Sequence, residues 1–285
     1  MVVKPHAGSG QFLWWHQLES SVALTASVES DPGESGTEQS RPVQKLELDD
    51  FSVPSFRGGY TAANHGRRGD AVFVGHYGVG LAAKRFAPQT SLGTLVFAAL
   101  FADLLAWGLV VVGVEHFAIR PRITTTNPLD LYDYPISHSL AMDFVWAALL
   151  AVTYYVIRRH WRGSVLLFVA VLSHWVLDFI AHRADMPLAP GIHRYYGLGL
   201  YNSRTGMIVV EGLVWFMGIA LYLGATRSKK RVGIYVFWLG AALLTWVWAI
   251  SLRGLPPPGT IIQAGISSLV FMAATLAWAY AVDHW

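Results

Sequence analysis

Apolar residues in this chain gather in long runs after about residue 90, and polar or Pro/Gly-containing stretches separate these runs. Each run has roughly the 20 residues that an α-helix needs to cross about 30 Å of hydrocarbon. A helix also satisfies its own backbone polar groups within lipid, and the runs are far too long for barrel strands. Six membrane spans are therefore predicted, at Leu92–Val114, His138–Ile157, Gly163–Ala181, Gly206–Thr226, Gly233–Leu252 and Thr260–Val282.

The first quarter of the chain has a different pattern. Residues 1–71 are rich in Ser, Gly, Glu and Pro and lack a sustained apolar period. Such a segment cannot bury enough apolar surface to offset the entropy of ordering it, so we predict a disordered polar tail. It contains no charged region followed by an apolar one, and we expect no cleavable signal peptide. Residues 72–285 form the predicted transmembrane domain.

A short apolar segment lies between the tail and the first span. Val72–Ala87 is glycine-rich, and Pro88 ends it. The segment is too short to span a bilayer and predicts an interfacial or re-entrant helix. The predicted fold class is therefore all-α: a polytopic membrane bundle of about six transmembrane helices with a short N-terminal interfacial or re-entrant helix.

The overall composition agrees with a membrane protein. Charged residues are 14% of the chain, hydrophobic residues are 54% and the mean hydropathy is +0.40, whereas an average soluble domain carries about 25% charged residues. The chain has no cysteine, which excludes disulfides and thiolate metal ligands. A net charge of +3 is too small to indicate nucleic acid, so the lipid bilayer is the expected partner.

Lysine and arginine in the short connections predict the orientation of the spans. They concentrate before the first span, between the second and third spans, and between the fourth and fifth, all on one side of the membrane: Lys84, Arg85, Arg158, Arg159, Arg162, Arg227, Lys229, Lys230 and Arg231. Because such residues are enriched on the cytoplasmic side, both termini are predicted to be cytoplasmic, in a cell (inner) membrane.

Ionisable residues lie within the predicted spans, where they usually face a bundle interior and mark function. His174 and Asp178 are four residues apart and share a helix face, which lets a nitrogen and an oxygen converge on one cation. At about 1.5 Å rise per residue, polar groups from four spans fall in the middle and outer bilayer. The sequence predicts a shared polar pocket that includes Asp103, His138, Asp143, His174, Asp178 and Glu211.

A simpler interpretation stays open for each of these residues. A single intramembrane His or Asp can be no more than a hydrogen bond between helices, and this alternative is strongest for Asp143 and Glu211. His182, four residues after Asp178, either joins the pocket or lies at the water interface.

Four short motifs occur in order along the chain: Gly75-His76-Tyr-Gly, Phe101-Ala-Asp103, Ser137-His138-Ser139-Leu140 and His174-x-x-x-Asp178. Together they resemble the YdjM-like family of inner-membrane metal-dependent hydrolases over residues 72–226. The resemblance implies hydrolysis of a phosphoester or similar bond and a divalent-metal site made by His76, Asp103, His138, His174 and Asp178. The family often has P-D-x-D where this chain has one acid, and H-R-G-x-x-H-S where it has Tyr-Pro-Ile-Ser-His-Ser, which weakens the case for a second metal.

If the chain is an enzyme, its nitrogen and oxygen ligands favour Zn²⁺ first, with Mn²⁺ or Mg²⁺ as alternatives. Glu211 or Asp143 would act as the general base, or orient a ligating histidine. The depth of the pocket favours a lipid or lipid-linked substrate. The loop Pro187–Thr205 either covers the pocket or is an ordered loop with interface aromatics.

Two other functions remain possible from the sequence. Intramembrane His, Asp and Glu residues serve proton relays as readily as metals, so the chain is alternatively a proton-coupled transporter or permease. It is also interpretable as a non-catalytic membrane protein with a structural metal site. No G-x-S-x-G or nucleotide-binding motif is present.

Overall fold

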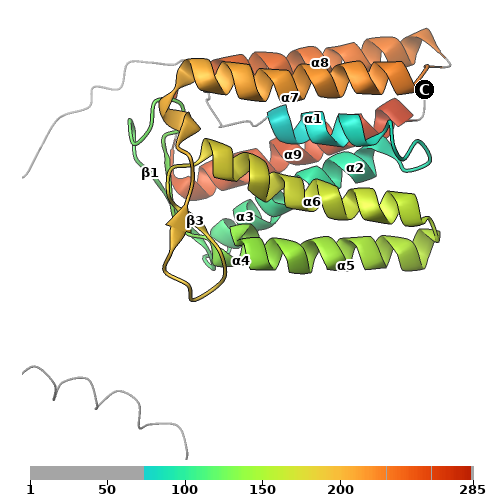
Figure 1. The fold of residues 1–285 in the computed structure, drawn as a ribbon. Helices are drawn as coiled ribbons and strands as arrows, with labels where there is room; N and C mark the ends of the chain where they lie inside the picture. The colour runs from blue at the N-terminus through green and yellow to red at the C-terminus, as the bar shows by residue number, and fades with distance from the viewer. Residues whose placement is uncertain (1–73, 229, 258, 284–285) are drawn as a thin grey trace, which may run out of the picture. The chain divides into compact units, whose positions relative to one another are not determined.

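The computed structural model describes residues 74–228, 230–257 and 259–283, and this part of the chain is a bundle of α-helices (Figure 1). The predicted tail, residues 1–71, lies outside the described residues, as do Val72, Phe73, Lys229, Pro258, His284 and Trp285. Helices in the described part are α1 (Val74–Ala83), α2 (Leu92–Ala99), α3 (Phe101–Val111), α4 (Pro135–His138), α5 (Leu140–Arg158), α6 (Trp161–Ala181), α7 (Arg204–Ala225), α8 (Arg231–Ser251) and α9 (Ile261–Asp283).

Five of the described helices, α5 to α9, are long and apolar enough to cross a membrane. Their outward faces carry large apolar side chains, such as Leu149 on α5, Leu213 on α7 and Leu239 on α8, which are more than half exposed. Soluble proteins rarely expose such continuous apolar surfaces. The chain is a multi-pass membrane protein, and the predicted all-α bundle is confirmed.

The first predicted span is a broken helix. Helices α2 and α3 together are long and apolar enough for one membrane span, but the chain bends by 59° between them, at Leu100. Ala99, the last residue of α2, accepts a hydrogen bond at its carbonyl from Nδ1 of His174 on α6, at 2.8 Å. The last carbonyls of a helix lack partners within it, so a side chain can satisfy one where a helix breaks. The break brings the start of α3 to α6.

Helix α1 is buried inside the bundle. It packs most extensively against α7 and also contacts α2 and α6 (Figure 1). Its ten residues extend about 15 Å, half of a bilayer core. Burial on several sides is not typical of a helix that lies on the membrane surface.

Contacts at the far end of α1 define one end of the bundle. Lys84 lies 2.7 Å from Asp283 at the end of α9, and Thr90 lies 3.5 Å from His160 at the α5–α6 turn. The backbone N–H of Leu92, at the start of α2, donates to Asp283. Lys84 and the basic α5–α6 turn therefore lie at the same end, as predicted.

Two short hairpins cover the opposite end. Strands β1 (His116–Ile119) and β2 (Leu129–Asp133) pair antiparallel, and β3 (Met186–Pro187) pairs with β4 (Tyr195–Tyr196). The loop between β1 and β2 is bonded to the 3-10 helix η1 (Leu200–Asn202), since the backbone N–H and hydroxyl of Thr126 both donate to the Tyr201 carbonyl. The sequence predicted these connections only as loops. Because they are ordered, they can form one wall of a site.

Glycines allow the close approach of α1 to α7. A Cβ at Gly78 would lie 2.5 Å from the carbonyl oxygen of Val214 and 3.0 Å from Cα of Trp215, both on α7. Neither contact can be relieved by a side-chain rotation, because both atoms belong to the backbone. Small residues are the usual means by which membrane helices pack this closely.

Replacing Gly78 by alanine is expected to destabilise the protein by about 1–3 kcal/mol, because the added methyl group would push α1 away from α7. Thermal unfolding of the detergent-purified chain measures this as a lower Tm. Gly108→Ala on α3 is the matched control, since a Cβ there meets no atom within 4 Å. Equal Tm values for the two variants would contradict the packing argument.

Candidate metal centre

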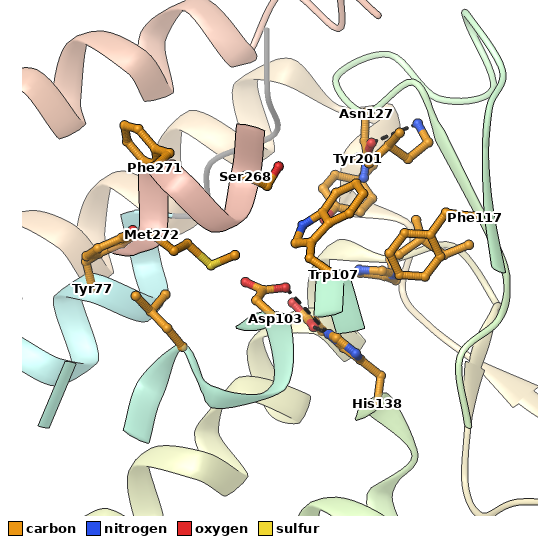
Figure 2. Close-up of a pocket in the computed structure, with 15 residues that line it drawn as sticks. Tyr77, Asp103, Trp107, Phe117, Asn127, His138, Tyr201, Ser268, Phe271 and Met272 are labelled. Carbon is orange, nitrogen blue, oxygen red and sulfur yellow. Dashed lines mark hydrogen bonds and ion pairs between the residues drawn. The ribbon is translucent and has the colours of Figure 1, made fainter. Parts of the chain in front are cut away.

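Five predicted ligands come together from four helices. His76 lies in the first turn of α1, Asp103 in the first turn of α3, His138 at the end of α4, and His174 and Asp178 one turn apart on α6. Figure 2 shows Asp103 and His138 facing each other, joined by a dashed line. His138 belongs to the separate short helix α4, where the sequence had predicted the start of the second span.

The ligand atoms form two triangles that share one edge. Nε2 of His138 lies 3.3 Å from Nε2 of His174. The nearest oxygen of Asp103 lies 3.6 Å from each of these nitrogens, and Oδ2 of Asp178 lies 3.5 Å from His138 and 3.3 Å from His174. With bonds of about 2.0–2.1 Å, two ligands of a tetrahedral ion are about 3.4 Å apart. Both triangles have the size of one face of such a site.

The hydrogen bonds of His174 fix which ring nitrogen carries a proton. Its Nδ1 lies 2.8 Å from the carbonyl oxygen of Ala99. A carbonyl can only accept, so Nδ1 must donate, and a neutral imidazole then has its lone pair on Nε2. That nitrogen points at the cluster. The Ala99 carbonyl thus fixes the tautomer and the orientation of the His174 ring, as hydrogen-bond partners of metal-ligating histidines commonly do.

The side chains of Ser137 and Glu115 fix the tautomer of His138 in a similar way. The hydroxyl of Ser137 donates to Oε2 of Glu115 at 2.6 Å, so the 2.8 Å contact between Nδ1 of His138 and the same hydroxyl oxygen is a bond that His138 donates. Oε1 of Glu115 also accepts the backbone N–H groups of Ile136 and Ser137, at 2.8 and 2.9 Å. Glu115 therefore holds the start of α4 and, through Ser137, directs the Nε2 lone pair of His138 into the cluster.

When both imidazoles are neutral, these bonds leave two Nε2 lone pairs facing each other across 3.3 Å, with a carboxylate oxygen on each side. Lone pairs at this separation repel unless a positive charge lies beside both. Two imidazoles and two carboxylates are a donor set typical of a divalent metal site, and so are hydrogen bonds that hold the second nitrogen of each ligating histidine. The residues present therefore fit a divalent ion.

His76 approaches the cluster from α1. Its Nε2 lies 3.2 Å from Oδ1 of Asp178, and its ring stacks on that of His174 with centroids 3.9 Å apart. His76, His174 and Asp178 offer atoms close enough to hold an ion as a second group beside Asp103, His138 and His174. His76 can therefore serve as a ligand, as predicted, or orient Asp178 through Oδ1.

Glu211 on α7 lies beside the cluster and has a structural contact. Its Oε2 accepts the backbone N–H of Gly75, near the start of α1, at 2.7 Å. A carboxylate at a helix N-terminus satisfies a free N–H and is favoured by the helix dipole. A Cβ at Gly75 would come within 2.9 Å of this carboxylate, so the glycine makes room for it. Glu211 fixes the end of α1 that carries His76; its predicted catalytic role stays a prediction.

Asp143 is fully buried in the first turn of α5. Neither carboxylate oxygen has a hydrogen-bond partner among the described residues. Asp143 and Glu211 both lie outside the set of residues that line the cavity described next. Their predicted role as general base is neither supported nor contradicted by this placement.

A cavity of ≈ 60 Å³ opens onto the cluster. This is room for several water molecules. Asp103 is the ligand that faces it most, with a side chain 26% exposed, whereas the other four are 0–3% exposed. Figure 2 shows the cavity between α3, α9 and the β1–β2 hairpin. Its lining comprises Tyr77, Leu100, Asp103, Trp107, Phe117, Asn127, Leu129, Leu131, His138, Asp178, His182, Tyr201, Ser268, Phe271 and Met272.

The hairpin end contributes groups that the sequence analysis did not identify. Glu115 is one, and the cavity residue Asn127 is another. Glu115 was detectable, as the only acidic residue at the predicted end of the first span. Tyr201 lies in the loop Pro187–Thr205, so that part of the loop does reach the cavity, whereas Tyr195 and Tyr196 are exposed.

Comparisons with known proteins add no relative to this geometry. No family model, no curated protein and no solved structure matches the chain. The resemblance to the YdjM-like family stays a prediction from four motifs.

Proposed function

We propose that this chain is a membrane-embedded, metal-dependent hydrolase of a phosphoester or lipid-linked substrate. The observation that carries the proposal is the 3.3 Å approach of the two Nε2 atoms of His138 and His174, with each ring held by a hydrogen bond at Nδ1 and carboxylate oxygens on both sides. The order of the four motifs that resemble the YdjM-like family supports the same reading.

In this proposal His138, His174, Asp103 and Asp178 hold a divalent ion, and His76 either joins them or holds Asp178 in place. Zn²⁺ suits the imidazole-rich set, with Mn²⁺ or Mg²⁺ as alternatives. Such an ion supplies Lewis-acid polarisation of the scissile group and a more acidic water. The protein's own contribution is to fix the ligands and to exclude bulk water, because all except Asp103 are nearly inaccessible to solvent.

The lining of the cavity supports a substrate with an apolar part. Leu100, Trp107, Phe117 and Phe271 line it beside the carboxylates, within a membrane domain. A phosphoryl group can reach Asp103 and His138 while an attached chain stays among apolar side chains. A lipid or lipid-linked phosphoester has this chemistry.

We also propose that the protein lies in the inner membrane with both termini on the cytoplasmic side. Support comes from Lys84 and the arginines of the α5–α6 turn, which lie at one end of the bundle. The cavity lies toward the other end, beside the hairpins. On this orientation it belongs to the outer half of the bilayer.

Metal content and hydrolysis of the detergent-purified full chain test the proposed function. Plasma mass spectrometry is expected to find near-stoichiometric zinc or manganese, and the loaded protein is expected to hydrolyse p-nitrophenyl phosphoesters or phosphorylated lipids. A wild-type chain that stays metal-free after incubation with Zn²⁺, Mn²⁺ and Mg²⁺ would overturn the hydrolase proposal. Proton-coupled transport, with a proton shared by His138 and His174, would then be the function to examine.

A further inference from the structure

His182 follows the last residue of α6 and is almost completely buried, at 3% exposure. From the sequence, His182 was predicted to lie either in the pocket or at the water interface. The structure places its ring in the wall of the cavity that also contacts Asp103, His138 and Asp178. A buried imidazole beside a candidate metal centre has several possible tasks, and its hydrogen bonds separate them.

Nδ1 of His182 lies 3.0 Å from Oδ1 of Asp185, which can only accept when ionised. Nδ1 therefore carries a proton. Nε2 makes no hydrogen bond with any described residue, although the ring lines the cavity. Nε2 is thus the nitrogen available to a bound substrate.

Asp185 is itself held by two further groups. Nε of Arg183 donates to Oδ2 at 2.9 Å, and the hydroxyl of Tyr134 donates to Oδ1 at 3.3 Å. Burial raises the pKa of Tyr134 well above its usual value, so its hydroxyl stays protonated. Arg183 in turn pairs with Asp130 at the start of the β1–β2 hairpin's second strand. This network holds the carboxylate, and with it the orientation of the His182 ring.

We infer that His182, positioned by Asp185, is the general acid that protonates the leaving group in the proposed hydrolysis. The inference rests on the proposed function and names a proton donor that the metal cluster does not provide. The other buried acids near the cluster, Asp143 and Glu211, do not line the cavity. An imidazole oriented by a carboxylate through Nδ1 is a recurrent acid–base arrangement.

The step needs only water, the phosphoester and His182. Attack of a water oxygen on phosphorus forms one P–O bond and breaks the P–O bond to the leaving alcohol. The proton on Nε2 of the doubly protonated His182 passes to the leaving oxygen, which departs as the alcohol. The proton that the attacking water gives up replaces the one lost from Nε2, which returns His182 to its starting state. Asp185 stabilises the imidazolium form before the transfer and holds the Nδ1 proton of the neutral ring after it.

Leaving-group dependence tests this role. An alkyl phosphoester needs a proton on its leaving oxygen, whereas a p-nitrophenyl ester leaves as a stable phenolate. His182→Asn is expected to lower kcat/KM for the alkyl ester by about 10²–10⁴-fold and to change the p-nitrophenyl ester much less. The asparagine amide can keep the bond to Asp185. His193→Asn, at an exposed loop position, is the matched control and is expected to leave both rates unchanged.

Two measurements that need no substrate turnover distinguish a general acid from a metal ligand at His182. Plasma mass spectrometry is expected to find the same metal content in His182→Asn as in wild type, and loss of the metal would instead make His182 a ligand and overturn the inference. Nitrogen-15 NMR of the metal-free chain is expected to show that wild-type His182, in its neutral form, keeps its proton on Nδ1, and that Asp185→Asn loses this preference.

The two proposals fail in different ways. A metal-loaded wild type that hydrolyses neither ester overturns the proposed function and this inference together. A wild type that hydrolyses both esters, with His182→Asn reducing the two rates equally, overturns only the general-acid role.

Discussion

Replacing Asp178 by asparagine is expected to weaken metal binding by more than about 100-fold. Changing a residue that merely orients a ligand typically costs 10–100-fold, so losing a ligand costs more. Asp178 contacts all three histidines of the cluster: its Oδ1 contacts His76, and its Oδ2 contacts His138 and His174. The amide has nearly the same volume but no charge. Competition with a metal-sensitive dye measures the affinity, and plasma mass spectrometry measures the amount bound after purification.

Asp133→Asn is the matched control for this substitution. Asp133 also pairs with a histidine, His116, at 2.8 Å, but both side chains are about half exposed at the start of the β1–β2 hairpin. Exposed pairs of this kind contribute little to stability. The control should therefore keep wild-type metal content. Full metal content in Asp178→Asn would contradict ligation by Asp178 and leave its contacts as helix–helix hydrogen bonds, the simpler interpretation of an intramembrane acid.

Much of this cluster was predictable because membrane helices have a regular rise. The spacing of His174 and Asp178 put both on one face of α6, and depth alone placed residues of different spans in one layer. The structure brings Asp103, His138, His174 and Asp178 within 3.6 Å of neighbouring members of the set. Lipid enforces straight, full-length spans in most of the chain, so linear distance along a helix translates into depth.

Prediction failed where the chain departs from that regularity. The bend at Leu100 occurs without proline or glycine at the break, so no local signal announced it. The Ala99 carbonyl that fixes His174 was invisible for the same reason, because every residue has a carbonyl and only the bend exposes this one. The β1–β2 hairpin is four to five residues per strand, too short for alternation to stand out.

The position of His76 depends on the glycines of α1 and on Glu211 of α7. The sequence placed His76 on a short apolar segment without showing how it could reach residues on the spans. Gly78 lets α1 approach the α7 backbone, and Glu211 accepts the Gly75 N–H at the buried end of the helix. Together they fix a half-length helix inside the bundle, with His76 stacked on His174. The glycines of this segment were visible in the sequence, but their partners on α7 are more than 130 residues away.

Removing the hydroxyl of Ser137 is expected to weaken metal binding by about 10–100-fold, although Ser137 contacts no ion position directly. In Ser137→Ala, Nδ1 of His138 loses its acceptor, and the ring is free to rotate or to adopt the other tautomer. Its Nε2 lone pair is then no longer directed at His174. The backbone N–H of Ser137 still donates to Glu115, so α4 keeps its first-turn hydrogen bonds and the fold should change little.

Ser139→Ala is the matched control, because it removes the same hydroxyl group from the residue on the other side of His138. Its hydroxyl accepts the backbone N–H of Met142 at 3.3 Å and caps α5, with no bond to the histidine. Ser139→Ala should therefore cost about 1 kcal/mol of stability and keep wild-type metal affinity, the reverse of Ser137→Ala. Measuring Tm and metal affinity for both variants separates orientation of a ligand from support of a helix. Equal metal affinities in the two variants would show that the Glu115–Ser137 relay serves the hairpin end of the fold and not the metal centre.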